Sequence, residues 1–200
     1  MNKLSDSAIV PQDVPPKFFA QHFKPYEFLS GFVRNKIVLE IGCGDGYGAD
    51  YLSRYAKRII AIDHSKDNIG HAESRYKKEN LKFKVMQALE LDFPDKSFDV
   101  AYSFQVIEHI PESKLVQYLT EIKRVLAQDG LACFSTLNLR HGMKPGTIYK
   151  KNPDHCKEFR FSELKDLLSK VFGSVKIYVG DFTLSLKHLP KAIDFICICS

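Results

Sequence analysis

The sequence predicts an α/β fold with a seven-stranded, mostly parallel sheet, helices on both faces and a C-terminal antiparallel hairpin. Apolar runs of strand length alternate with segments of helical periodicity, which is typical of a parallel sheet covered by helices. The last two apolar runs are separated by about a dozen residues that contain Pro190 and no clear crossover helix, which favours a hairpin. The 200 residues, 44% hydrophobic and 26% charged, suit one globular domain.

The expected domain spans residues 17–200 and follows a proline-containing segment, residues 1–16, that we expect to be a mobile tail. Residues 17–36 carry several aromatic side chains among polar ones and predict one or two amphipathic helices that form an N-terminal lid. Residues 137–161 are too long for a bare connection and predict a second, substrate-covering lid.

The periodicity predicts strands and helices in alternation. The expected strands are 37–41, 58–62, a third that starts at Lys82 and runs into a loop by Glu90, a fourth that ends at 103–105, then 131–136, 175–179 and 193–199. The expected helices after the N-terminal lid are 49–56, 66–78, 111–127 and 161–172. Pro111 suits the first turn of its helix, Gly130 lies just beyond the end, and Ser162 is the expected cap of the last helix.

A glycine-rich loop follows the first predicted strand. Gly42, Gly44 and Gly46 are spaced two apart, and Glu40 precedes them. Glycine lets the backbone turn sharply and approach a ligand where a Cβ would clash, and the following helix starts with unpaired N–H groups. The second strand is followed by Asp63, whose carboxylate can accept hydrogen bonds from both hydroxyls of a ribose. These features predict a site for an adenosine-containing ligand.

Two ligand classes fit this loop. Counted from Gly44, the residues match the dinucleotide pattern G-x-G-x-x-A, which would indicate an NAD(P)-dependent oxidoreductase. Counted from Gly42, where the strand ends, the pattern is G-x-G-x-G. The acidic side chains of Glu40 and Asp45 would repel a pyrophosphate, whereas S-adenosylmethionine (SAM) carries a sulfonium and an ammonium group. Charge therefore favours SAM.

The glycine loop, Asp63 and the stretch from Phe93 to Ile110 resemble the class I SAM-dependent methyltransferases, in particular the small-molecule, type-11-like family. That stretch is similar to the family's F-x-D-x-x-F-D-V segment and its ending on E-H. The resemblance implies the Rossmann-like class I methyltransferase fold, SAM as cofactor and S-adenosylhomocysteine (SAH) as its product. It implies these cofactor-binding residues: Glu40, Gly42, Cys43, Gly44, Asp45, Gly46, Asp63, His64, Gln87, Ala88, Leu89, Ser103, Phe104 and Gln105.

Several of these residues have an expected partner on the cofactor. Family members commonly carry an Asp where this chain has Gln87, whose amide can accept from the adenine amino group but can also donate. Ala88 and Leu89 would hold the edge and face of the base. Residues 103–105 would border the methionine half and the transferred methyl. Because Asp63 would lie at a strand end in an open crevice, we do not expect it to be a packing residue.

The methyl acceptor is expected to lie under the two lids. His155 is the candidate general base, because it lies beside acidic neighbours and small-molecule methyltransferases often resemble its P-x-H-x-x-x-F setting; a histidine bonded to the loop backbone is the alternative. The other expected substrate residues are Tyr26, His109, Lys150 and Lys151. Residues 137–161 carry six basic and two acidic residues, which suggests an anionic acceptor, although solvated loop lysines would give the same count.

Other features narrow the class of protein. The five cysteines form no C-x-x-C pair, so we expect a reducing, cytoplasmic location and no metal. No long apolar run lies near Met1, and we expect no membrane span. Nucleic acid is an unlikely partner, because no D/N-P-P-Y/F tetrapeptide is present. A segment from Phe134 to Asn138, with residues 161–164, looks like the quinone-biosynthesis O-methyltransferases. Sugar, quinone and amine acceptors, a non-catalytic SAM-binding role and the oligomeric state stay open.

Overall fold

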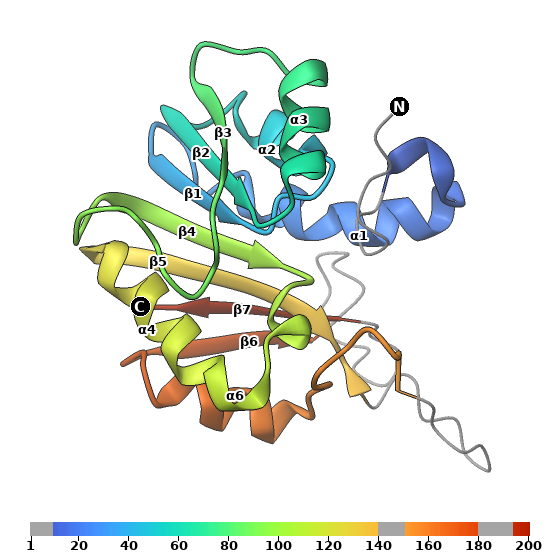
Figure 1. Cartoon of the computed structure of the whole chain (residues 1–200). Helices are drawn as coiled ribbons and strands as arrows, with labels where there is room; N and C mark the ends of the chain where they lie inside the picture. Colours follow the sequence, from blue (N-terminus) through green and yellow to red (C-terminus); the bar gives the residue numbers. More distant parts are fainter. Residues whose placement is uncertain (1–9, 140–150, 180–193) are drawn as a thin grey trace.

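Seven strands form one sheet in the order β3-β2-β1-β4-β5-β7-β6. The computed structural model describes residues 10–139, 151–179 and 194–200 (Figure 1). The strands are β1 (Ile37–Ile41), β2 (Arg58–Asp63), β3 (Leu81–Val85), β4 (Phe98–Phe104), β5 (Leu126–Leu137), β6 (Val175–Val179) and β7 (Asp194–Cys199). The pairs among β1 to β5 are parallel, and β7 pairs antiparallel with both β5 and β6. The predicted sheet and closing hairpin are confirmed.

Helices cover both faces of this sheet (Figure 1). They are α1 (Pro16–Leu29), α2 (Tyr47–Leu52), α3 (Lys66–Arg75), α4 (Leu115–Val125) and α6 (Phe161–Ser169), with short 3-10 turns η1 (Pro11–Asp13), η2 (Ile107–His109) and η3 (Glu112–Lys114). Successive strand residues point to opposite faces, so neighbours such as Val100 and Ala101 belong to two separate hydrophobic clusters. One cluster contains side chains of α4 and α6, and the other contains side chains of α1, α2 and α3.

The N-terminal segment differs from the expected mobile tail. Residues 1–9 lie outside the described part of the chain, but Val10 is buried and η1 follows it. The Arg75 guanidinium of α3 donates a hydrogen bond to the side-chain oxygen of Gln12 at 2.9 Å. The prediction of a tail is therefore wrong for residues 10–16, because these residues contact the helix layer. Of the two helix counts expected for residues 17–36, the structure has one helix, α1, which ends at Leu29.

Several helix boundaries differ from the expectation, and contacts explain two of them. The helix predicted over 111–127 begins as the 3-10 turn η3 and ends at Val125, because Leu126 is extended and pairs with Phe98 at the start of β5. Helix α6 starts after Arg160, whose backbone N–H donates to the Glu163 carboxylate at 2.8 Å, so Ser162 is not its cap. The pairing of Leu126 with Phe98 thus sets the end of α4, and the bond between Arg160 and Glu163 sets the start of α6.

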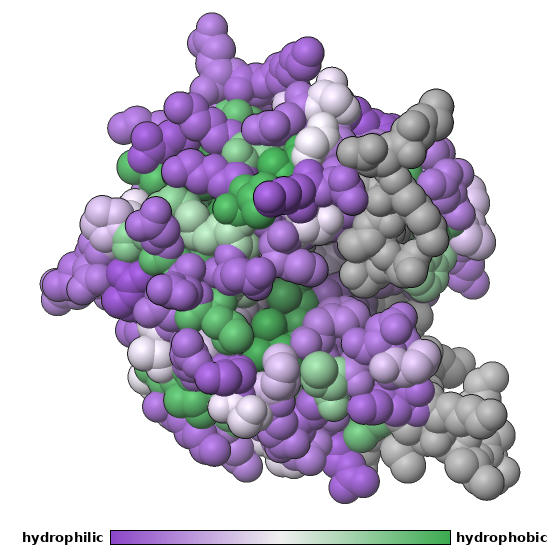
Figure 2. Space-filling view, viewed as in Figure 1, coloured by the Kyte–Doolittle hydropathy of each residue, from purple (hydrophilic) through white to green (hydrophobic). Residues whose placement is uncertain are grey.

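Strand β1 lies between β2 and β4, where the order of the strands reverses. Ligands of open α/β sheets bind in the crevice beyond the carboxyl ends of the strands at such a point. The face drawn in Figure 2 is mostly hydrophilic, with hydrophobic residues gathered near its middle. Among the described residues, no helix combines the length and the apolar character that crossing a bilayer requires.

Candidate active site

The glycine loop after β1 has a backbone that other residues could not adopt without strain. Gly42, Gly44 and Gly46 have φ angles of 76°, 51° and 90°. A Cβ on Gly42 would overlap the Val106 side chain, and one on Gly46 would lie 2.8 Å from Ala72. The loop thus packs tightly against the segment after β4 and against α3.

Asp63, at the end of β2, holds this loop. Its Oδ2 accepts a hydrogen bond from the Gly44 N–H at 2.9 Å, and its Oδ1 accepts from the Ser65 N–H at 2.9 Å and from the Asn68 amide at 3.2 Å. Asp63 is only 5% exposed, so it also supports the fold, contrary to our expectation. Because a carboxylate has about four acceptor sites, capacity for a ligand hydroxyl is left. Sequence reasoning missed Asn68, which lies in the first turn of α3, five residues after Asp63.

A cleft of about 430 Å³ lies beyond the carboxyl ends of β1, β2 and β4. That volume falls within the roughly 300–1,000 Å³ of small-molecule sites. Nine predicted cofactor or substrate residues line it, namely Gly42, Gly44, Asp63, His64, Gln87, Ala88, Leu89, Gln105 and His109. The remaining lining residues are Ile41, Ile62, Asn68, Met86, Val106, Ile110 and Pro111. Two other hollows lie on the surface, one along α3 and β3 and one at the start of β1.

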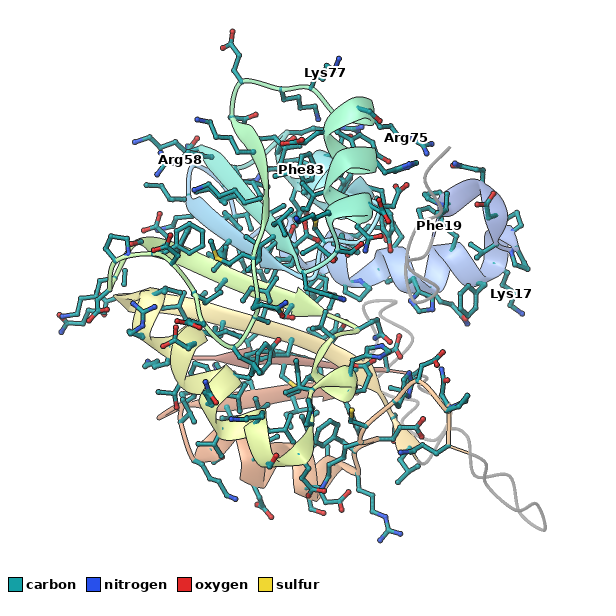
Figure 3. The ribbon with its side chains drawn as sticks, in the orientation of Figure 1. Lys17, Phe19, Arg58, Arg75, Lys77 and Phe83 are labelled. Atoms are coloured by element: carbon teal, nitrogen blue, oxygen red, sulfur yellow. The ribbon has the colours of Figure 1, made fainter. Side chains whose placement is uncertain are left out.

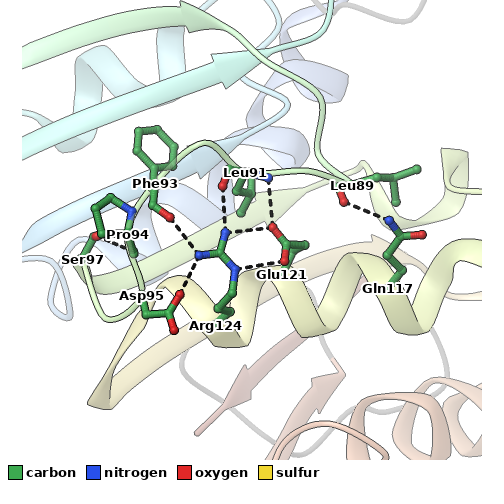
Figure 4. A network of polar contacts seen from close by, with 9 residues as sticks. All are labelled: Leu89, Leu91, Phe93, Pro94, Asp95, Ser97, Gln117, Glu121 and Arg124. Atoms are coloured by element: carbon green, nitrogen blue, oxygen red, sulfur yellow. Dashed lines mark hydrogen bonds and ion pairs between the residues drawn. The ribbon is translucent and has the colours of Figure 1, made fainter.

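The loop that carries Ala88 and Leu89 into the cleft is tied to α4 (Figure 4). The Arg124 guanidinium donates to the backbone carbonyls of Leu91 and Phe93 and pairs with the Glu121 and Asp95 carboxylates. These bonds to Arg124 lower the pKa of the Glu121 carboxyl. Further along α4, the Gln117 amide donates to the Leu89 carbonyl at 3.2 Å. Polar side chains of α4, Gln117 and Arg124, therefore hold the loop that forms this wall of the cleft.

Asp45 and Cys43 do not line the cleft. The buried Asp45 carboxylate accepts from the Tyr76 hydroxyl at 2.8 Å, and it lies 2.8 Å from a ring nitrogen of His71 and 3.6 Å from the Arg75 guanidinium. These partners belong to α3 and the residue after it, so Asp45 joins the loop to that helix. Cys43 belongs to the hydrophobic cluster on the same face, as does Phe83 of β3, which faces α3 (Figure 3).

Glu40 and Tyr26 form a separate buried pair on the α1 side of the sheet. The Tyr26 hydroxyl lies 3.5 Å from Glu40 Oε1, and Glu40 is 1% exposed. Burial raises the pKa of Glu40 to about 8. The Tyr26 ring occupies the space where a Cβ on Gly48 would lie, so this glycine permits α1 to dock on α2. Neither Tyr26 nor Glu40 borders the cleft.

Of the predicted residues at the end of β4, Gln105 alone reaches the cleft. Ser103 is fully buried; its hydroxyl donates to the Ile41 carbonyl at 3.0 Å and accepts from the Tyr118 hydroxyl at 2.6 Å. Phe104 packs in the cluster below α1. Gln105 has a positive φ of 56°, and its amide donates to the Ser135 hydroxyl at 3.3 Å. The turn at Gln105 directs the chain from β4 into the cleft wall.

The cleft ends at a group of acidic and imidazole side chains, which we call the histidine end and define as Glu108, His109, His155 and Glu158. All are buried except His109, which is half-buried. The rings of His109 and His155 meet edge to face with centroids 5.0 Å apart. His155 Nδ1 lies 2.7 Å from the Glu158 carboxylate, and His109 Nδ1 lies 3.0 Å from the Asp154 carbonyl. Burial, then the charge of His109, lowers the pKa of His155.

Glu108 lies beneath the two rings and is 1% exposed. The Thr136 hydroxyl at the end of β5 donates to its Oε2 at 3.0 Å, and burial raises the pKa of Glu108 to about 8. The sequence assigned no role in the site to Glu108 or Glu158, although Glu158 follows His155 at a spacing of three. Lys150 lies outside the described residues; Lys151 is exposed, and its ammonium donates to the Cys156 carbonyl at 3.2 Å.

Comparisons with known proteins agree with this geometry. A family model described as a methyltransferase domain matches residues 39–134. A probable SAM-dependent methyltransferase from Mycolicibacterium smegmatis is 35% identical over 165 residues, which cover 82% of this chain and 62% of that protein. A ubiquinone biosynthesis O-methyltransferase from Rickettsia akari is 28% identical over 155 residues, covering 72% and 61%.

The fold has close structural neighbours as well. The structure of a DhpI–SAH complex superposes with a TM-score of 0.71 at 20% identity, covering 95% of this chain and 88% of that one. The chain spans less than two thirds of the length of the curated relatives reported above. The family match, the relatives and the seven-stranded sheet together show that this chain belongs to the class I SAM-dependent methyltransferases.

Proposed function

We propose that this protein transfers the methyl group of SAM to an oxygen atom of a small acceptor that lies against the histidine end of the cleft. The observation that carries this proposal is the position of His109. It lines the cleft and also packs on the buried His155, which lies outside the cleft lining. The cofactor cleft therefore meets a place where an imidazole, His155, is oriented by a buried carboxylate, Glu158.

The residues of the cleft suit SAM. The bound cofactor supplies an electrophilic methyl group on a sulfonium, whose S–C bond breaks with its electron pair left on sulfur. Asp63 would hold the ribose hydroxyls, the glycine loop 42–46 would let the backbone approach the ligand, and residues 87–89 would hold the adenine. The pairing of Asp63 with the Gly44 N–H supports this, because it keeps the carboxylate at the mouth of the glycine loop.

His155 would help the acceptor oxygen to lose its proton. Because Nδ1 lies 2.7 Å from Glu158, we assign the ring proton to that nitrogen, which leaves a lone pair on Nε2. The Asn152 amide lies 3.3 Å from Nε2, consistent with that tautomer. Burial lowers the pKa of His155, which keeps the imidazole neutral near pH 7. An oriented neutral imidazole suits proton removal from a hydroxyl.

An oxygen acceptor with negative charge fits these features best. The relative from Rickettsia akari is a ubiquinone biosynthesis O-methyltransferase, which supports oxygen as the methylated atom. Lys151 lies close enough to His155 to lower its pKa, so the side chain adds positive charge beside the expected acceptor position. We extend the proposal to the two lids: residues 17–36, docked through Tyr26, and residues 137–161 would cover the acceptor.

The test begins with binding and ends with product. Calorimetric titration should give micromolar or tighter affinity for SAH and none for NAD, and binding of NAD alone would support an oxidoreductase instead. Incubation with SAM and a panel of hydroxylated acids, phenols, sugars and amines should then give a product heavier by one methyl group. If the protein binds SAH tightly but methylates no acceptor and consumes no SAM, it is a non-catalytic SAM-binding protein.

A further inference from the structure

Three side chains at the histidine end converge on one point. Glu108, His109 and His155 each offer a ligand atom, and these atoms lie within 4.8 Å of one another. Glu108 and His155 are buried, and His109 lines the cleft. No other group of this kind occurs among the residues that the structure describes. No sequence pattern predicted this group, because His155 lies far along the chain from the Glu108–His109 pair.

The hydrogen bonds of both histidines leave the same nitrogen available. Nδ1 of His109 faces the Asp154 carbonyl and Nδ1 of His155 faces the Glu158 carboxylate, so each Nδ1 carries the proton in the neutral ring. Each Nε2 then keeps its lone pair. Histidine ligands of metals usually donate their second ring N–H to a carboxylate or a backbone carbonyl, as both rings do here. The bond from Asn152 to Nε2 of His155 is long, at 3.3 Å, and a cation would replace it.

The surrounding carboxylates lack positive partners. Glu158 Oε2 and the nearby Asp194 Oδ1 are buried, and in the described residues neither has a hydrogen-bond donor. No lysine or arginine of the described residues pairs with Glu108, Glu158 or Asp194. Glu108 and Glu158 accept hydrogen bonds from uncharged groups, the Thr136 hydroxyl, the Asn152 N–H and the neutral His155 ring. A buried carboxylate with no counter-charge and one oxygen that lacks a donor is costly. A cation held between these groups would supply the missing charge.

We propose that Glu108, His109 and His155 bind one divalent transition-metal cation, with Glu158 as the outer carboxylate that orients His155. Two imidazoles and one carboxylate suit Zn²⁺, Mn²⁺ or Fe²⁺ better than Mg²⁺ or Ca²⁺, which prefer oxygen ligands. Three protein ligands also leave at least one coordination position open, as in catalytic metal sites.

This inference rests on the proposed function only for the role of the cation. An acceptor hydroxyl bound at the open position loses its proton to water more readily, because the cation stabilises the oxyanion that forms. His155 then assists proton loss as a ligand of the cation rather than by taking the proton itself. The preferred acceptor would be one that can also coordinate a metal, such as a catechol or a 2-hydroxy acid.

Metal binding can be measured apart from activity. After dialysis against a chelator and then metal-free buffer, the whole protein should bind one Zn²⁺ per chain in calorimetry, and Co²⁺ should give visible absorption bands of a nitrogen- and oxygen-ligated site. His109→Ala and His155→Ala should each lose this binding. Glu158→Gln should weaken it about 10–100-fold, the usual effect of removing an outer carboxylate.

Two matched controls and one independent measurement complete the test. His22→Ala removes a histidine of α1, and Cys156→Ser removes an exposed thiol beside His155; both should bind Zn²⁺ like the wild type. Each variant should still bind SAH, which reports an intact cleft. Absence of Zn²⁺ binding by the wild type, unchanged binding by His109→Ala and His155→Ala, or its loss in Cys156→Ser would overturn the proposal. Failure of the wild-type protein to bind SAH would count against the proposed function and not against the metal site.

Discussion

The glycine loop with Asp63 and the histidine end of the same cleft draw their residues from different distances along the chain. Residues 42–46 and Asp63 belong to one strand-loop-helix-strand unit, within which Asp63 accepts a hydrogen bond from the Gly44 N–H. Glu108, His109 and His155 meet only because β4 and the segment before α6 pack together, through bonds from the Cys156 and Lys157 N–H groups to the Glu108 carbonyl. The cofactor end is therefore assembled from residues that are close in sequence, whereas the histidine end depends on tertiary packing.

The largest effect should come from His155→Ala, which tests whether the histidine end performs the chemistry. We expect kcat to fall about 100–10,000-fold, the usual contribution of acid–base or equivalent activation, because the acceptor would lose its help in proton release. The affinity for SAH, measured by calorimetry, should stay within about threefold, because His155 does not line the cleft. Equal losses of SAH affinity and kcat would mean that the two ends are not separate.

Gly42→Val tests the rigidity of the other end. The positive φ and the overlap with Val106 should cost about 2–4 kcal/mol of unfolding free energy, measured by urea denaturation, and SAH binding should be lost. Gly70→Ala in α3 is the matched control, since nothing lies within 4 Å of its Cβ position. That change should stabilise the protein by about 0.5–1 kcal/mol. A stable Gly42→Val protein that still binds SAH would contradict the assignment of the loop.

Asp63→Ala should weaken SAH binding by about 1.5–3 kcal/mol, the usual worth of hydrogen bonds to a charged group. The structure adds a second expectation, a loss of stability, because the Gly44 and Ser65 N–H groups and the Asn68 amide would lose their acceptor. Asp63→Asn keeps one acceptor oxygen and should retain more stability than affinity. Melting temperatures and calorimetry on both variants separate the two effects, and unchanged affinity in both would remove Asp63 from the cofactor site.

Glu40→Gln tests the buried pair under α1. Burial raises the pKa of Glu40 from 4.5 to about 8, so between these values the folded protein holds a proton that the unfolded chain has released. This group's stabilising contribution is complete below pH 4.5 and is lost as the pH rises through 8. Glutamine cannot ionise, so the unfolding free energy of the variant should fall less between pH 5 and 8, by on the order of 4 kcal/mol. Parallel curves for the two proteins would contradict a raised pKa.

Lys151→Ala should have the smallest effect, because Lys151 is exposed and exposed charges contribute at most about 1 kcal/mol. If the acceptor is anionic, its KM should rise a fewfold at low salt and the difference should vanish at high salt, with kcat unchanged. Lys165→Ala on the exposed side of α6 is the control. A KM that does not change at any salt concentration would favour an uncharged acceptor; Lys150→Ala extends the test to the adjacent lysine.

Local signals in the sequence were sufficient for the elements and the cofactor. The apolar run at 37–41, the glycines at 42, 44 and 46 and the acid at 63 predict a strand, a loop and a second strand within ±1 residue of where they lie, because each signal acts through its immediate neighbours. The antiparallel pairing of β6 and β7 was predicted from the lack of a clear helical pattern in the sequence between them. The boundary at Leu126 was missed, because its pairing with Phe98 outweighed helical periodicity.

Which side chains share the cleft was decided only by the tertiary structure. The sequence alone determined that glycine, acidic and amide residues follow the strand ends, and nine of the residues predicted to contact cofactor or substrate do line the cleft. It could not show that Asp45 turns to α3, that Ser103 is locked beneath Tyr118, or that His155 meets His109 and Glu108. These outcomes depend on contacts between segments that are distant in the chain. No local sequence pattern determines which way a side chain at a strand end points or which residue it contacts.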